Sequence, residues 1–165
     1  MDNKKELPER KRNRLENYDY SSCGAYFITV CTSERRNYFW KNIPTVIDRP
    51  QDVELSTYGK TVDQAIQNIP FAYPALSLES YVIMPNHLHI LLRICDNENG
   101  RSMIAPTISQ VIKQLKGIVS KQIGVSIWQK SFHDHIIRNY EDYEEHLHYI
   151  YENPMRWCYD ELYCP

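Results

Sequence analysis

Residues 84–92, near the middle of the chain, read Met84-Pro85-Asn86-His87-Leu88-His89-Ile90-Leu91-Leu92. The Pro-Asn pair predicts a tight turn, and the apolar residues after it predict a β-strand over residues 87–94. Successive side chains of a strand point to opposite faces, so we expect His87 and His89 to project side by side. Two neutral imidazoles on one face can hold a divalent metal ion. On spacing alone, two hydrogen-bonded histidines on a polar sheet face are an equal alternative.

The segments around this strand predict alternating strands and helices. Residues 76–84 predict the other arm of a hairpin, and residues 25–32 are rich in β-branched and aromatic side chains, which favours a first strand. Apolar spacing predicts one helix from residue 55 or 56 to 68, ended by Pro70, and a second from residue 107 or 108 to 123. Thr107 is the expected N-cap of the second helix, and Gly124 is expected to end it.

The rest of the chain completes the expected fold. A fourth strand is expected within residues 125–137, and a third helix over about residues 141–152. The resulting order, β-α-β-β-α-β-α, is that of the split βαβ unit. We therefore predict an α+β, ferredoxin-like antiparallel sheet with an additional C-terminal helix.

Length and composition limit the class of protein. A chain of 165 residues with 42% hydrophobic residues suits one domain, which we assign to residues 21–165 behind a flexible basic arm over residues 1–20. We expect no membrane-spanning helix, because no apolar run reaches about 18 residues. The polar N-terminus does not resemble a secretory signal, so a cytoplasmic protein is expected. Five cysteines without a C-x-x-C pair argue against a disulfide framework or a zinc knuckle.

Charge is unevenly distributed along the chain. The net charge of −2 by itself argues against a nucleic-acid partner. Residues 101–133 nevertheless contain no acid and carry the basic residues Arg101, Lys113, Lys116, Lys121 and Lys130. A local basic face can bind phosphates even when the total charge is slightly negative, although charge alone favours a solvated helix face.

The third predicted helix carries a candidate nucleophile. Tyr149 and Asn153 are four residues apart and share one helix face. A tyrosine hydroxyl can form a covalent intermediate, but with a pKa near 10 it needs activation at neutral pH. A metal can help by polarising a phosphoryl oxygen, and the amide oxygen of Asn153 can serve as its third ligand. Because the chain has 13 tyrosines, spacing alone does not distinguish Tyr149 from a packing residue.

Taken together, these motifs resemble the HUH single-tyrosine transposases, of the insertion-sequence and REP-associated tyrosine transposase type. The resemblance runs from about Tyr26 to Trp157. It rests on the segments Val82-Ile83-Met84-Pro85-Asn86-His87-Leu88-His89, Ile112-Lys113-Gln114-Leu115-Lys116-Gly117, Ile127-Trp128-Gln129-Lys130-Ser131-Phe132-His133-Asp134-His135-Ile136-Ile137-Arg138 and Tyr149-Ile150-Tyr151-Glu152-Asn153-Pro154.

The resemblance implies an enzyme that cuts single-stranded DNA near a hairpin and forms a 5′-phosphotyrosine bond, leaving a free 3′-hydroxyl. Tyr149 matches the nucleophile, and His87 and His89 match the ligands of a Mg²⁺ or Mn²⁺ ion. Asn153 lies where many members have glutamine as a third ligand, and His135 is a competing candidate for that role.

The implied partner is a single-stranded DNA hairpin, and the protein is expected to be a monomer or a homodimer. The candidate DNA contacts are Arg101, Lys113, Lys116 and Arg138. The alternative function is a ferredoxin-like protein that binds structured DNA or RNA without cutting it. Phe132 supports this alternative, since some relatives have tyrosine at that position.

Overall fold

The structure, a computed structural model, describes residues 23–44, 46–95 and 106–164. The predicted arm over residues 1–20 and the candidate DNA contact Arg101 lie outside the described residues. None of the described helices is long and apolar enough to cross a membrane. In chain order the strands, α-helices and 3₁₀ helices (η) are β1 (Gly24–Cys31), η1 (Ser33–Arg35), η2 (Pro50–Asp52), α1 (Thr57–Gln67), α2 (Ile69–Ala72), β2 (Leu76–Ile83), β3 (His87–Ile94), α3 (Ile108–Ile123), β4 (His133–Ile136), α4 (Tyr140–Glu152) and η3 (Asn153–Tyr159).

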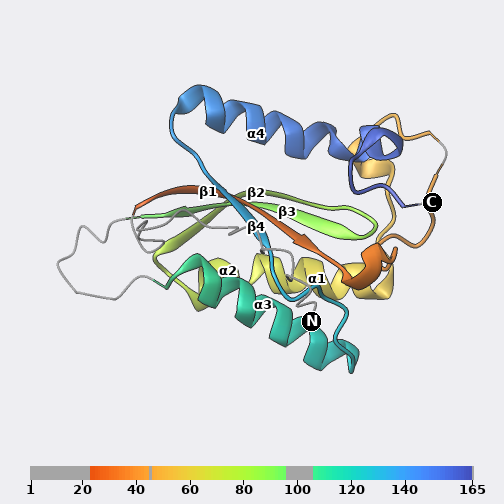
Figure 1. The fold of residues 1–165 in the computed structure, drawn as a ribbon, viewed down its shortest axis with the longest axis horizontal. Coiled ribbons are helices and arrows are strands. Elements are labelled where there is room, and N and C mark those ends of the chain that lie inside the picture. The colour runs from red at the N-terminus through yellow and green to blue at the C-terminus, as the bar shows by residue number, and fades with distance from the viewer. Residues whose placement is uncertain (1–22, 45, 96–105, 165) are drawn as a thin grey trace, which may run out of the picture.

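The strands form one antiparallel sheet in the order β2-β3-β1-β4 (Figure 1). The central pair is therefore β3 and β1, and the hairpin partner β2 lies at one edge. This is the split βαβ arrangement. The predicted α+β, ferredoxin-like fold is confirmed, with α4 as the additional C-terminal helix.

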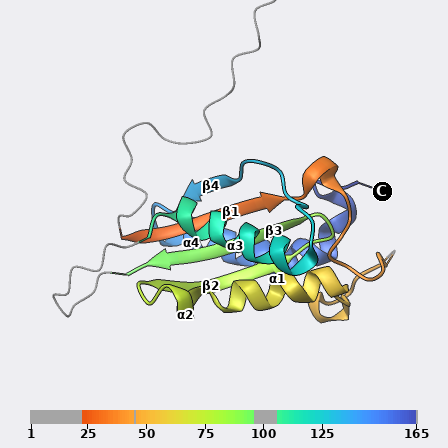
Figure 2. The same cartoon turned by 90° about the horizontal axis from the view of Figure 1, so that it is seen from below.

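Helices cover both faces of the sheet. α1 and α3 pack side by side on one face, and α4 lies on the other (Figures 1 and 2). The larger core lies between the sheet and the α1–α3 pair, and β3 contributes Leu88, Ile90, Leu92 and Ile94 to it. A smaller apolar cluster beneath α4 contains Phe27, Leu91 and Ile150. The strand alternation therefore directs His87 and His89 to one face, as the sequence predicts, and this is the face that α4 covers.

Local signals set the ends of the helices. The Ser56 side chain caps α1 by accepting a hydrogen bond from the backbone N–H of Gly59. Thr107 and Gln110 form a reciprocal capping box at the start of α3. Gly124 ends α3 with φ 85°, a left-handed conformation that a residue without Cβ adopts at little cost.

Two predicted boundaries differ from the structure. The fourth strand is only β4, because residues before it contribute a single bridge, Thr32 to Trp128, while the Trp128 side chain packs into the core. The first helix does end before Pro70, but this proline lies in the first turn of α2. A proline is tolerated there because the N–H it lacks has no partner within the helix.

Candidate active site

His87 and His89 form a buried pair on the face of β3 beneath α4. Their Nε2 atoms are 3.1 Å apart, and both side chains are buried. Neighbouring ligands of an octahedral metal with bonds of about 2.1 Å lie about 3 Å apart. The two nitrogens therefore have the separation that one such ion requires.

Hydrogen bonds determine which nitrogen of His87 carries the proton. The Asn86 amide nitrogen donates to two backbone carbonyls, so its Oδ1 is the accepting atom. His87 Nδ1 lies 2.8 Å from this oxygen and must donate to it. In the neutral ring the lone pair is then on Nε2, the atom that faces His89. His89 is held in a similar way, with Nδ1 2.9 Å from the Thr29 hydroxyl on β1. Such support from behind is typical of histidines that bind a metal.

Burial keeps both imidazoles neutral. Desolvation, together with a smaller contribution from the positive charge of Arg35, lowers the pKa of His87 to about 3. Desolvation also lowers the pKa of His89 well below its ordinary value, with smaller contributions from neighbouring histidines. The neutral form is the one that binds a metal, so the pair is ready to do so at neutral pH.

Tyr149 approaches this pair from α4. Its ring meets the ring of His89 edge-on, with centroids 5.1 Å apart, and Phe27 contacts both rings. The tyrosine is 44% exposed, so one side of it is open to a substrate. Burial of the remainder raises the pKa of the phenol, as does the charge of Asp160, while a hydrogen bond with Asn153 lowers it. The phenol is therefore protonated at neutral pH in this arrangement.

Asp160 joins the site, although the sequence offers no pattern that links it to the histidines. After α4, helix η3 turns the chain back toward the sheet, and Asp160 directly follows this turn. Its carboxylate lies 3.8 Å from His87 Nε2, and its side chain is only 4% exposed. Burial raises the pKa of this carboxyl. The ligand atoms of His87, His89 and Asp160 all lie within 4.8 Å of one another.

Asn153 lies beside these groups at the start of η3. Its side chain is buried and hydrogen-bonds with Tyr149 and Asp160. Its Oδ1 is also buried and accepts no hydrogen bond from the described residues. Leaving such an oxygen unpaired is costly, and amide oxygens are accepted ligands of hard cations. Two imidazoles, a carboxylate and an amide oxygen thus fit a divalent metal.

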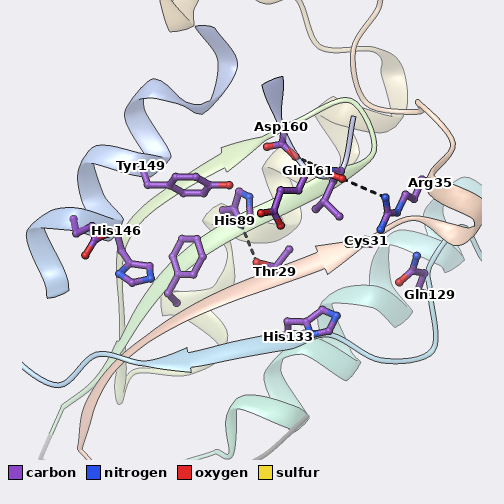
Figure 3. A pocket seen from close by; sticks show the side chains of 13 residues that line it. Thr29, Cys31, Arg35, His89, Gln129, His133, His146, Tyr149, Asp160 and Glu161 are labelled. Atoms are coloured by element: carbon purple, nitrogen blue, oxygen red, sulfur yellow. Dashed lines mark hydrogen bonds between the residues drawn. The ribbon is translucent and has the colours of Figure 1, made fainter. Parts of the chain in front are cut away.

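A cavity of about 490 Å³ opens over His89. Figure 3 shows Tyr149 and Asp160 above His89 and Thr29, with His146 to the left and Arg35 and Gln129 to the right. Arg35 belongs to η1, where it and Glu34 both have positive φ angles, 52° and 55°. Non-glycine residues adopt this conformation at a cost, which is typical of positions that serve a site. Sequence reasoning missed Arg35, because only the fold brings η1 to the cavity.

The other predicted site residues lie apart from the cavity. Lys113 and Lys116 are on α3, in the layer on the opposite side of the sheet, and neither they nor Arg138 line the cavity. Lys116 donates to the backbone carbonyls of Gln129 and Ser131, and burial lowers the pKa of its amine to about 8. This amine is therefore already used within the fold.

The competing third ligand, His135, is also elsewhere. It hydrogen-bonds to Asp142 and stacks on His146, in a separate cluster. Phe132 packs against the larger core and does not line the cavity, so the position where some relatives carry tyrosine is not next to the histidines here.

Comparison with known proteins gives relatives over most of the chain. No family model matches it. An uncharacterized protein of Haemophilus influenzae is 30% identical over 176 residues, which cover 95% of this chain and 94% of that protein. The REP-associated tyrosine transposase of Escherichia coli K12 is 26% identical over 138 residues, which cover 83% of this chain and 70% of that protein.

A solved structure shares the fold. It is a REP-associated tyrosine transposase bound to a REP hairpin, and it matches with a TM-score of 0.58 at 23% identity, over 87% of this chain and 74% of that one. The same family therefore emerges from the sequence relatives and from the motifs that surround His87, His89 and Tyr149. The named sequence relatives of this chain are thus REP-associated tyrosine transposases, the type that its motifs resemble.

Proposed function

We propose that this transposase-like protein cuts and rejoins single-stranded DNA beside a hairpin through a 5′-phosphotyrosine bond to Tyr149. The observation that supports this most directly is the contact between Tyr149 and His89 at the open side of a buried, neutral histidine pair. A nucleophile must lie next to the groups that hold the phosphate, and this tyrosine does so within one chain. The contact within one chain supports a monomer that needs no tyrosine from a partner.

We assign the divalent metal site to His87, His89 and Asp160, with Asn153 as an additional oxygen donor. When bound, Mg²⁺ or Mn²⁺ would polarise the scissile phosphate and offset the charge of Asp160, which raises the pKa of Tyr149. Thr29 and Asn86 orient the two imidazoles from behind. The Tyr149 oxygen is not one of the assigned metal ligands, so it can approach the phosphorus.

The proposed reaction needs no external energy source. The Tyr149 phenol loses its proton as its oxygen attacks phosphorus, and the bond from phosphorus to the 3′-oxygen breaks. The 3′-oxygen takes up a proton and leaves as a free hydroxyl, while the 5′-phosphate remains on the tyrosine. Attack by a 3′-hydroxyl of another strand reverses these steps and restores a phosphodiester, because one phosphodiester bond is exchanged for another.

DNA binding is proposed to involve a hairpin, as in the solved relative, whose structure holds a REP hairpin. Arg35 lies at the cavity and is suited to a backbone phosphate near the scissile bond. Lys113 and Arg138 remain candidate contacts for duplex or flanking strands away from the cavity. Lys116 is a weaker candidate, because its amine is bonded to two carbonyls.

The test uses single-stranded hairpins taken from DNA that flanks the gene, incubated with the full chain and Mn²⁺. Denaturing electrophoresis should show a slower protein–DNA band. Tyr149→Phe removes only the phenol oxygen, so it should abolish this band while hairpin binding in a native gel is unchanged. Tyr151→Phe, on the same helix but 62% exposed, is the matched control and should still form the band.

Two outcomes would reject the proposal. An adduct formed by Tyr149→Phe would mean that another residue is the nucleophile. Tight hairpin binding without an adduct in the unaltered protein, with either Mg²⁺ or Mn²⁺, would favour the alternative of a binding protein that does not cut.

A further inference from the structure

A second group of metal-binding side chains lies where β4 meets the first turns of α4. It consists of His135 from β4 and of Asp142 and His146 from α4, with ligand atoms within 4.8 Å of one another. We propose that these residues form a second metal site, which takes a transition metal of the zinc class and joins β4 to α4. The proposal goes beyond the DNA chemistry above and does not depend on it.

The distances suit one small ion. His135 Nε2 lies 2.9 Å from Asp142 Oδ1, and His146 Nδ1 lies 3.1 Å from the same oxygen. Ligands of a tetrahedral Zn²⁺ with bonds of about 2.0–2.1 Å lie about 3.3 Å apart. The two imidazoles are stacked, with centroids 4.6 Å apart and planes 14° apart. Because a metal lies in the plane of each imidazole that binds it, one ring would rotate for both nitrogens to reach one ion. His146 Nδ1 also lies 2.8 Å from the backbone carbonyl oxygen of Asp142, so the bond to an ion would replace this hydrogen bond.

The carboxylate is held independently of the histidines. The backbone N–H of Arg138 donates to Asp142 Oδ2 over 2.9 Å, and both carboxylate oxygens face His135 Nε2, at 2.9 and 3.0 Å. Asp142 and His146 are one helical turn apart, so the α4 backbone fixes the relation between these two ligands. Burial acts to raise the pKa of Asp142, but the hydrogen bonds from Arg138 and His135 outweigh it and lower the pKa. The carboxylate is therefore ionised at neutral pH.

The donor set indicates the class of metal. Two imidazole nitrogens and one carboxylate oxygen favour Zn²⁺ and its neighbours over Mg²⁺, which prefers oxygen ligands and keeps its waters. His135 is 43% exposed, which gives an ion a path from solvent and leaves room for a water as fourth ligand. His87 and His89, by contrast, are both buried.

The position of the cluster connects it to the tyrosine helix. The His146 ring packs on Phe27, with centroids 4.5 Å apart, and Phe27 in turn contacts Tyr149. A small apolar cluster and the hydrogen bond from the Tyr143 hydroxyl to Glu79 connect α4 to the sheet. An ion shared by β4 and α4 would therefore restrain the helical turn that precedes Tyr149.

The test is a Zn²⁺ titration of the full chain after removal of metals with a chelator, followed by calorimetry. Either His135→Gln or Asp142→Asn should remove one equivalent of bound Zn²⁺, or lower the Zn²⁺ affinity by about tenfold or more. The same titration in a His87→Gln background isolates the second site, where one equivalent should remain. His148→Gln is the matched control, because this histidine lies on the same helix, is exposed, and pairs only with Glu152 among the interactions described for it.

Thermal unfolding provides a second readout. Zn²⁺ should raise the melting temperature of the unaltered protein and of His148→Gln, and should do so less for His135→Gln, because an ion that binds only the folded state stabilises it. His135 is an exposed strand residue, so its replacement tests the site even if the Asp142 variant fails to fold. Unchanged Zn²⁺ stoichiometry and affinity in His135→Gln would overturn the proposal.

Discussion

Tyr149 and His89 are in edge-on ring contact, although one comes from α4 and the other from β3. The contact places the phenol within reach of anything bound to the two imidazoles. It requires that α4 lie along the sheet face opposite α1 and α3, which Figure 1 shows directly. The predictions below follow from this arrangement and from the packing that maintains it.

Asp160 is predicted to be a metal ligand. Asp160→Asn keeps the size of the side chain but removes its charge, so Mn²⁺ affinity should fall by about tenfold or more. Formation of the DNA adduct should fall with it, whereas hairpin binding without metal should not change. Calorimetry and the adduct gel measure these effects. Glu161→Gln is the matched control, as the next acid along the chain. Equal effects of the two substitutions would show that only the net charge of this segment matters.

Arg35 is predicted to contact a DNA phosphate. Arg35→Gln removes one positive charge at the cavity, so the slope of log affinity against log salt concentration should decrease in magnitude by about 0.7–0.9. Fluorescence anisotropy with a labelled hairpin over a range of salt concentrations measures this slope. Lys121→Gln removes an exposed charge from the last turn of α3, which lies on the far side of the sheet, and should leave the slope unchanged. An unchanged slope in the Arg35 variant would remove this contact from the interface.

The buried histidines predict a loss of stability in acid. The pKa of His87 is about 3 in the folded protein, against 6.5 as its ordinary value. Between these values the unfolded chain binds a proton that the folded chain does not. The free energy of unfolding therefore falls as the pH falls below 6.5, by about 1.4 kcal/mol per pH unit from this residue.

Urea denaturation in the presence of a chelator, from about pH 7 to about pH 5, tests this expectation. Asp160 acts in the opposite direction, since folding raises the pKa of its carboxyl group. His87→Gln should reduce the slope whatever its effect on stability at neutral pH. A slope that is identical in the variant would mean that His87 does not titrate in this way.

Gly59 is predicted to be irreplaceable at the contact between α1 and the segment before it. A Cβ added there would lie 2.2 Å from the Phe39 carbonyl oxygen, a backbone atom that cannot move aside cheaply. Gly59→Ala should cost about 2 kcal/mol or more. Gly117→Ala is the control, since its Cβ would meet nothing within 4 Å in α3, and it should stabilise the protein by about 0.5–1 kcal/mol. Urea denaturation distinguishes the two, and equal stability would contradict the close contact.

Local patterns in the sequence determined the helices and strands, and they placed His87 and His89 on the same face of a strand. The β3 strand begins at His87 and ends at Ile94 as predicted, because a proline turn precedes it and its apolar residues continue without a break. The period of two then places both histidines on one face, whatever packs above them. Thr107 and Gly124 likewise set the ends of α3 through hydrogen bonds and backbone angles that involve only nearby residues.

Tertiary structure alone decided which groups meet the histidines. Asp160 reaches His87 only because η3 reverses the chain after α4, and Arg35 reaches the same cavity from η1. His135 pairs with Asp142 instead, and Lys116 donates to two carbonyls, so residues that look equivalent in the sequence have different roles. The physical reason is that periodicity and capping act over one or two turns of chain. Distances between remote residues depend on how helices pack on the sheet, and that depends on the whole core.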